Sequence, residues 1–173
     1  MDTIPVFCIA VYDEGMKAAI SALKFERTLA ILPVLQQLIL DHFPDVWRDA
    51  DLLLPVPISV QRRKERGFNQ CERLLEPLSR ALNLPLITNA IVRGKETRPL
   101  YTLTEEERKA EVQGVFSLAN PALIAGKKIL LFDDIVTTGT TITEMTRLLA
   151  SAGAREIYVL GLSKTVLRQA LSF

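Results

Sequence analysis

Apolar runs long enough to form buried strands alternate along the chain with segments that carry an apolar residue every three or four positions. The runs predict strands at residues 6–12, 51–57, 86–92, 128–132 and 156–162. The periodic segments predict helices at residues 16–25, 29–42, 74–82 and 142–152. Continuous apolar strands are typical of a parallel sheet that is covered on both faces. The pattern therefore predicts an α/β domain with a mostly parallel sheet flanked by helices.

The run Lys128–Phe132 leads into the most distinctive part of the sequence. Two acids follow it, Asp133 and Asp134, and then come two apolar residues and a turn rich in hydroxyl groups, Thr137–Thr141. Because successive strand residues alternate in direction, we expect the two acids to point to opposite sides of the chain. The sequence thus predicts a strand, an acidic tip, a turn of the size of a phosphate group, and a helix.

The residue types at this tip indicate a ligand with two different polar ends. Asp133 and Asp134 can accept hydrogen bonds from a pair of sugar hydroxyls, or face a bound magnesium ion. The N–H groups at a helix N-terminus favour a phosphate, and a glycine lets the backbone approach it closely. The residues expected to hold that phosphate are Thr137, Thr138, Gly139, Thr140 and Thr141. Because like charges keep the acids away from the phosphate, the two parts together describe a ribose 5-phosphate.

The stretch from Lys128 to Thr141 resembles the phosphoribosyl-pyrophosphate (PRPP) binding motif of the type I phosphoribosyltransferases. Four apolar residues, two acids, two apolar residues and a Thr-Thr-Gly-x-Thr turn match that motif in order. The resemblance implies a type I phosphoribosyltransferase-like fold, with PRPP as ligand and Mg²⁺ as cofactor. It implies that Asp133 and Asp134 are the catalytic acids, which hold the ribose hydroxyls near the metal. The C1–O bond would break towards an oxocarbenium-like state that the site stabilises by positioning and charge.

A basic segment, Gln61–Gln70, follows the strand expected at residues 51–57. Taken alone, such a charge run is often a solvated face. Its position after a strand end, in a chain with a phosphate motif, favours a clamp for pyrophosphate or DNA, because arginine matches phosphate oxygens in a bidentate way. The residues expected to contact the ligand are Arg62, Arg63, Arg66, Phe68 and Asn69. Phe68 could stack on a base or only pack against the protein.

Further strings resemble the ComF family, the phosphoribosyltransferase-like competence proteins. These strings are Tyr12…Gly15, Lys24-Phe25, Leu54-Pro55-Val56-Pro57, Arg62-Arg63, Arg66-Gly67-Phe68-Asn69-Gln70 and Arg108…Gly114-Val115-Phe116. The resemblance implies a role in DNA uptake during natural transformation, with single-stranded DNA and the competence helicase machinery as partners. Many members carry an N-terminal zinc module with two CxxC pairs, and no such pair occurs in this sequence. Leu100-Tyr101 and Glu111 stand where the family usually has Gln and Asn, which bears on catalytic competence.

Bulk composition narrows the functional classes further. The 173 residues suffice for a single domain, expected here to span residues 1–173, and the net charge of +1 favours no particular partner. Cys8 and Cys71 form neither a disulfide framework nor a metal pair, so a reducing cytoplasm is expected. Neither a signal peptide nor an apolar run long enough to cross a membrane is evident. The single histidine, His42, is expected to cap a helix C-terminus rather than to catalyse.

Functions from different classes remain open at this point. The first is an enzyme that transfers phosphoribosyl from PRPP to an unidentified acceptor, although no convincing general base is evident. The second is a non-catalytic module that binds single-stranded DNA, with the basic stretches Arg62–Arg66 and Arg93–Arg98 beside Phe68 and Tyr101. Because pyrophosphate needs the same cations, these stretches favour DNA only modestly. A third option is a regulator that binds PRPP without reacting.

Overall fold

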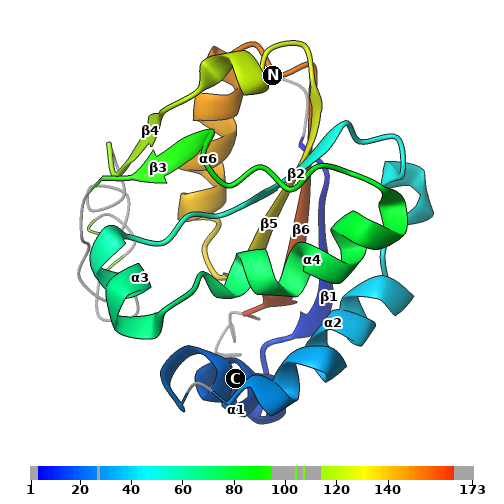
Figure 1. Ribbon diagram of the computed structural model, residues 1–173, viewed down its shortest axis with the longest axis vertical. Coiled ribbons are helices and arrows are strands. Elements are labelled where there is room, and N and C mark those ends of the chain that lie inside the picture. The colour runs from blue at the N-terminus through cyan, green and yellow to red at the C-terminus, as the bar shows by residue number, and fades with distance from the viewer. Residues whose placement is uncertain (1–3, 27, 95–103, 105–106, 108–113, 166–173) are drawn as a thin grey trace, which may run out of the picture.

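The computed structural model describes residues 4–26, 28–94, 104, 107 and 114–165. Its centre is a four-stranded sheet in the order β1-β6-β5-β2, in which every pairing is parallel (Figure 1). The strands are β1 (Val6–Val11), β2 (Leu52–Pro55), β5 (Lys128–Val136) and β6 (Glu156–Lys164). A separate antiparallel pair consists of β3 (Ile91–Arg93) and β4 (Phe116–Leu118). The carboxyl ends of the four parallel strands therefore lie at one edge of the sheet, where ligands bind in open α/β folds.

Helices cover both faces of the sheet, which confirms the predicted architecture (Figure 1). On one face lie α1 (Glu14–Ser21), α2 (Leu32–Asp41) and α4 (Gln70–Leu82), and on the other lies α6 (Thr140–Ser151). The shorter elements are the π-helical turn η1 (Ala22–Glu26), the 3-10 turns η2 (Leu29–Ile31), η3 (Asp45–Trp47) and η5 (Pro121–Leu123), and the helix α3 (Val60–Arg66). No helix among the described residues is long and apolar enough to cross a membrane.

Strand β5 separates two hydrophobic cores. Leu130 and Phe132 pack into the core beneath α1, α2 and α4, whereas Ile129 and Leu131 pack into the core beneath α6. All four side chains are fully buried. Burial on both faces explains why this strand reads as a continuous apolar run instead of alternating with polar residues.

The predicted elements agree with the observed ones except in a few places. The strand expected at residues 86–92 is reduced to β3, because Leu86 forms only a single bridge to Leu53. The helix expected from residue 74 begins earlier, at Gln70, and continues through Pro77. The ring of His42 contacts the carbonyl oxygen of Leu38 at 3.0 Å, so it caps the end of α2 as expected.

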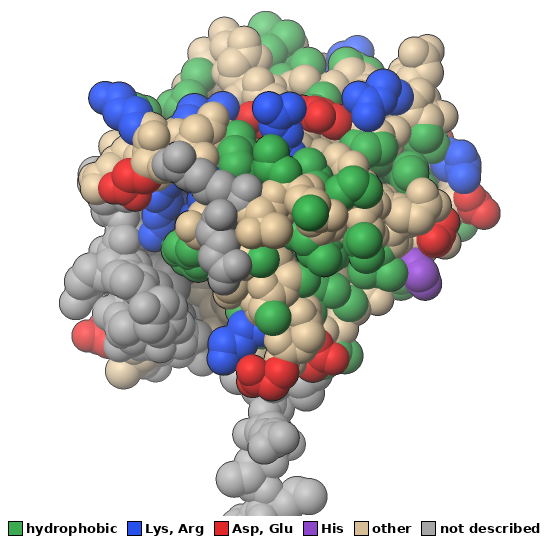
Figure 2. Space-filling view, turned by 60° about the horizontal axis from the view of Figure 1, so that its bottom comes forward, with side chains coloured by type: hydrophobic (Ala, Val, Ile, Leu, Met, Phe, Trp, Pro, Cys, Tyr) green, Lys and Arg blue, Asp and Glu red, His purple; other side chains and the backbone are tan. Residues whose placement is uncertain are grey.

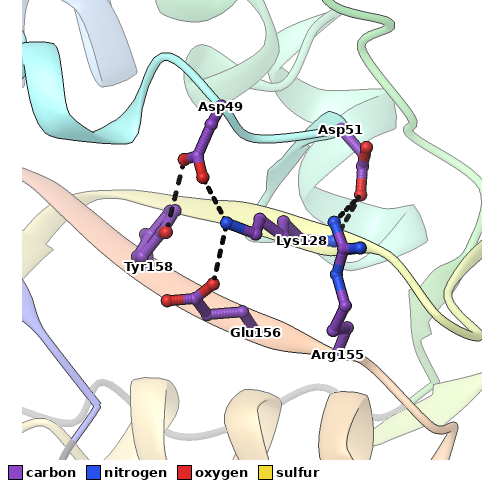
Figure 3. A network of polar contacts seen from close by, with 6 residues as sticks. All are labelled: Asp49, Asp51, Lys128, Arg155, Glu156 and Tyr158. Atoms are coloured by element: carbon purple, nitrogen blue, oxygen red, sulfur yellow. Dashed lines mark hydrogen bonds and ion pairs between the residues drawn. The ribbon is translucent and has the colours of Figure 1, made fainter.

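Charged residues tie together the amino ends of the strands, at the edge opposite to the acid pair (Figure 3). The ammonium of Lys128 pairs with Asp49 and, at 3.2 Å, with Glu156. Asp51 accepts the backbone N–H of Lys128 at 2.7 Å and pairs with Arg155 at 3.3 Å. The hydrogen bonds that Lys128 donates to Asp49 and Glu156 raise its pKa above the usual value. Because every charged group in this network already has a partner within it, we assign the network to the register of β5 and β6 rather than to ligand binding.

Gly161 gives a test of the sheet packing. A Cβ added there would lie 2.8 Å from Sγ of Cys8 and 2.9 Å from Cγ2 of Val136. We expect Gly161→Ala to lower the free energy of unfolding by about 1–3 kcal/mol, because the extra methyl overpacks the sheet. Urea denaturation measures this loss. The control is Gly15→Ala in α1, where a Cβ meets only a side-chain oxygen at 3.5 Å and should be neutral or stabilising. Equal midpoints for the two variants would contradict the packing described here.

Candidate functional site

The acid pair lies near the carboxyl end of β5 and is almost completely enclosed. Asp133 is 9% exposed and Asp134 4% exposed. The thiol of Cys71, in the first turn of α4, lies beside them: its Sγ and one oxygen from each acid lie within 4.8 Å of one another. The backbone N–H of Asp134 also donates to Oδ1 of Asp133 at 2.9 Å. The site is therefore a buried polar centre between β5 and α4, not an exposed strand tip.

The expectation that the two acids point to opposite sides of the chain was wrong. Leu130 and Phe132 face the core beneath α4, and Ile135 packs against that same core although it lies three residues after Phe132. Strict alternation would place Ile135 on the opposite face. The alternation of side chains therefore slips at the acid pair, and the two carboxylates converge near Cys71.

Lys24 is the cation that reaches the acid pair, and it comes from a segment distant in sequence. Its Nζ lies 2.6 Å from Oδ2 of Asp134, and the two side chains are only 17% and 5% exposed. That oxygen is shut off from solvent and receives no well-oriented hydrogen bond from the described residues, so charge attraction holds the pair together. Lys24 belongs to one of the strings that resemble the ComF family, but it was not predicted to be a site residue. A single cation between Leu23 and Phe25 gave little local signal of its role.

Burial changes the acidity of the neighbouring groups. Desolvation, together with the charge of Asp134, raises the pKa of Asp133 from its ordinary 3.8 to about 7, against the opposing influence of Lys24. Desolvation and the two acids also raise the pKa of the Cys71 thiol well above its usual value. Burial therefore favours the protonated forms of the Cys71 thiol and of the Asp133 carboxyl.

This group of residues does not fit direct coordination of Mg²⁺. That ion takes oxygen ligands in near-octahedral geometry and dehydrates reluctantly. Of the three clustered groups, Cys71 offers only a protonated thiol, and Asp134 already faces the ammonium of Lys24. Both facts weigh against a metal held between Asp133 and Asp134. We therefore derive no chemical step through a metal ion held by these residues.

The turn after β5 leaves a helix N-terminus without a side-chain cap. Helix α6 starts at Thr140, and the residue before it, Gly139, has a φ of +79° and supplies no capping group. Only the hydroxyls of Thr138 and Thr140 bond to each other, at 2.8 Å. Thr137 and Thr138 are exposed, and Thr141 is half-buried. No side chain therefore caps the backbone N–H groups of the first turn, and the phosphate site predicted for this turn stays a prediction.

The basic segment forms helix α3, and its arginines have different surroundings. Arg63 pairs with Glu72 of α4, which neutralises it. Arg66 donates to Gln70 and lies close enough to Asp134 to feel its charge, while burial lowers the pKa of Arg66. Arg62 is half-buried, and its charge reaches Arg66. Of the three predicted arginines, Arg66 therefore interacts with the acid pair through its charge, whereas Arg62 lies close to Arg66 and Arg63 pairs with Glu72.

Asn69 and Phe68 have structural contacts at the start of α4. Asn69 is fully buried: it donates to the carbonyl of Val56 at 3.0 Å, and it caps α4 by accepting the N–H of Cys71 at 3.0 Å. Phe68 packs against the core beneath α4. Asn69 thereby fixes the start of α4, and with it Cys71, against the loop that follows β2.

Phe25 is an aromatic residue that the sequence analysis did not assign to the site. It is 76% exposed, and the guanidinium of Arg66 lies over its ring at 5.8 Å. Exposed apolar residues also include Leu29 and Val34, in the same part of the chain. Figure 2 shows hydrophobic side chains gathered on the half of this view that carries the single histidine. Phe25 differs from the other two because it contacts a cation near the acid pair.

Comparison with known proteins supplies the family. The family model for the phosphoribosyl transferase domain matches residues 69–162. The chain is 33% identical over 163 residues to the DNA utilization protein YhgH of Escherichia coli K12, which covers 91% of this chain and 71% of that protein. It is 32% identical over 162 residues to competence protein F of Haemophilus influenzae, which covers 90% of this chain and 71% of that protein.

A solved structure supports the same fold. The glutamine PRPP amidotransferase of B. subtilis is similar with a TM-score of 0.56 and 18% identity, over 94% of this chain and 32% of that one. At this identity the similarity concerns the fold, which is that of the type I phosphoribosyltransferases. Together with the parallel sheet and the match to curated relatives, it shows that the chain belongs to the ComF family of phosphoribosyltransferase-domain proteins.

Proposed function

We propose that this protein binds PRPP, or a related ribose 5-phosphate, and acts in DNA uptake during natural transformation. The observation that carries the proposal is the placement of two converging carboxylates directly before an uncapped helix N-terminus. The carboxylates accept hydrogen bonds from a diol, and the helix N-terminus binds a monophosphate. The relatives called competence protein F and DNA utilization protein support the biological role.

Each part of the ligand has a place in this proposal. Asp133 and Asp134 hold the ribose hydroxyls, and the turn from Thr137 to Thr141 holds the 5-phosphate. Arg62 and Arg66 attract the pyrophosphate, since guanidinium groups match phosphate oxygens. Mg²⁺ would accompany the pyrophosphate and neutralise part of its charge. Asn69 acts indirectly, because its buried amide positions α4.

For an enzyme, the residues described here would act by positioning and charge. The anchored 5-phosphate and hydroxyls fix the ribose while the bond between C1 and the pyrophosphate oxygen breaks, and the electron pair leaves with the pyrophosphate. The carboxylates then lie close to the positive charge that develops on the ring, which they stabilise. An acceptor nucleophile forms the new bond to C1. We infer phosphoribosyl transfer as the activity, with PRPP sensing without turnover as the alternative.

A second candidate function is binding of single-stranded DNA. Phe25, exposed beneath the guanidinium of Arg66, favours it, because bases stack on aromatic rings beside cations. Lys64 is also exposed and adds to the positive charge of α3. In this proposal the protein works with the competence helicase machinery in the cytoplasm, where Cys8 and Cys71 remain free thiols.

The acid pair gives the first test of PRPP binding. We expect Asp133→Asn with Asp134→Asn to weaken binding of ribose 5-phosphate by about a hundredfold or more, because two charge-assisted hydrogen bonds are lost. Isothermal titration with ribose 5-phosphate and with PRPP measures the loss. Asp49→Asn, at the opposite edge of the sheet, is the matched control and should leave both affinities unchanged. Unaltered affinity in the double variant would refute the assignment of the acids.

The raised pKa of Asp133 predicts a dependence of stability on pH. Between its ordinary pKa of 3.8 and its folded value of about 7, the folded state binds more protons than the unfolded state. Stability is therefore lost as the pH rises through this window, and Asp133→Asn removes that loss. We expect the melting temperature of the variant, minus that of the wild type, to be greater at pH 8 than at pH 4. Asp49 has a pKa below its ordinary 3.8, so its pH window lies under pH 4, and the difference for Asp49→Asn should be nearly the same at pH 4 and pH 8. Equal differences for Asp133→Asn at the two pH values would contradict the raised pKa of Asp133.

Phe25 tests the second candidate function. We expect Phe25→Ala to weaken binding of a short oligothymidylate by about tenfold, because base stacking on an aromatic ring is lost. Fluorescence anisotropy of a labelled oligonucleotide at fixed salt measures the change, and an abasic oligonucleotide of equal length isolates the stacking. Leu29→Ala is the control, since Leu29 is exposed nearby without a cation over it. Equal losses for both variants would show that exposed apolar surface, and not stacking, accounts for the effect.

A further inference from the structure

Lys24 occupies a position at the acid pair that nothing in the PRPP motif explains. Its backbone belongs to the π-helical turn η1, while the carboxylate that it contacts belongs to β5. Leu23, the residue before it, is fully buried and anchors the turn in the core beneath α4. Phe25, the residue after it, points to solvent. The turn therefore directs the Lys24 side chain inward, and an extra residue per turn of this kind is frequent at functional sites.

The charges around the site make this contact important. Two adjacent carboxylates and one thiol lie close together. The Nζ of Lys24 lies 2.6 Å from Oδ2 of Asp134. The guanidinium of Arg66, which feels the charge of Asp134, is engaged with Gln70 and with the ring of Phe25. Asp133 has its Oδ1 bonded to a backbone N–H. Among the described residues, Lys24 is thus the cation that directly contacts a carboxylate of the pair.

We propose that Lys24 is the resident cation of the acid pair, a positioning residue that takes the place a divalent ion would otherwise hold. The inference rests on the proposed ribose-binding function of these acids and deepens it. The ammonium fixes Asp134 with one oxygen inward, so that the diol meets a carboxylate whose orientation is already set. The acids then bind ribose hydroxyls without direct metal coordination.

Displacement of Lys24 by a divalent ion is unfavourable for two reasons. An incoming ion would need the oxygen that the ammonium already contacts. The displaced lysine, whose side chain is only 17% exposed, would have to leave for solvent or remain as an uncompensated charge. If Lys24 is removed, the two carboxylates lose their counter-charge and become a better site for a hard cation. The proposal thus predicts a gain of metal binding when a cation is deleted from the chain.

Direct titration with Mn²⁺ in the absence of any ligand tests this prediction. Mn²⁺ takes the same oxygen ligands as Mg²⁺, and electron paramagnetic resonance distinguishes its free and bound forms. We expect Lys24→Met to bind Mn²⁺ about tenfold or more tightly than the wild type, because the carboxylates have lost their ammonium partner. Lys24→Arg keeps the charge and should resemble the wild type. Lys24→Met with Asp134→Asn removes both charges and should lose the gained binding.

A matched control and a second measurement make the experiment decisive. Lys17→Met removes another lysine that pairs with an acid, at 3.7 Å from Glu14 on the exposed side of α1, and should leave Mn²⁺ binding unchanged. If circular dichroism shows that Lys24→Met does not fold, Mn²⁺ titration of the wild type and of Asp134→Asn still tests the proposal. Mn²⁺ binding by the wild type that Asp134→Asn abolishes would overturn the proposal. The same affinity in a folded Lys24→Met and the wild type would also overturn it.

Ribose 5-phosphate connects this inference to the proposed function. In the wild type its affinity should be the same in EDTA and in Mg²⁺, because this ligand carries no pyrophosphate to bring an ion. In Lys24→Met its affinity in EDTA should fall about tenfold, through loss of a charge-assisted contact to Asp134, and Mg²⁺ should restore part of it. A strong requirement for Mg²⁺ in the wild type would overturn the resident-cation role. If no variant binds ribose 5-phosphate, the proposed function fails, whereas the Mn²⁺ titration still tests Lys24.

Discussion

The burial of two adjacent carboxylates at the end of β5 is the constraint on which this site depends. Charge that is removed from water must be met within the protein. At Asp134 the ammonium of Lys24 compensates the charge. At Asp133 a backbone N–H donates to the carboxylate, and the raised pKa favours the neutral acid. The contact of Lys24 with Asp134 joins the N-terminal turn η1 to the sheet, and Cys71 at the start of α4 lies beside the same acids. The site is thus assembled by segments that are far apart in the sequence.

The amino ends and the carboxyl ends of the strands have different roles. At the amino ends of β5 and β6, Lys128 and Arg155 pair with acids of neighbouring segments, and each of these charged groups has a partner. At the carboxyl ends, the charges lie beside an uncapped helix N-terminus and half-buried arginines. Because one edge fixes the register of the strands, the other can keep polar groups oriented toward a ligand. Ribose 5-phosphate, PRPP and single-stranded DNA all carry phosphates that would meet the same positive surface.

Local sequence predicted the strand, acids, turn and helix correctly, because each of these features is encoded by neighbouring residues. It could not predict what depends on distant contacts. Asn69 has an amide side chain of the kind that often binds ligands. In the folded chain, however, this amide donates to the carbonyl of Val56, which is distant in sequence. Lys24 meets Asp134 only after η1 packs against the sheet. The two acids converge because the alternation of side chains along β5 is interrupted at this point. No residue type in β5 predicts that interruption.

The central claim is that one ribose 5-phosphate spans the acid pair and the start of α6. A crystal structure of the protein with this ligand tests it most directly. The account predicts the ribose hydroxyls within hydrogen-bonding distance of Asp133 and Asp134, the 5-phosphate on the N–H groups from Gly139 to Thr141, and the Lys24–Asp134 contact retained. A phosphate bound instead at Arg62 and Arg66, with the acids free of the sugar, would contradict it.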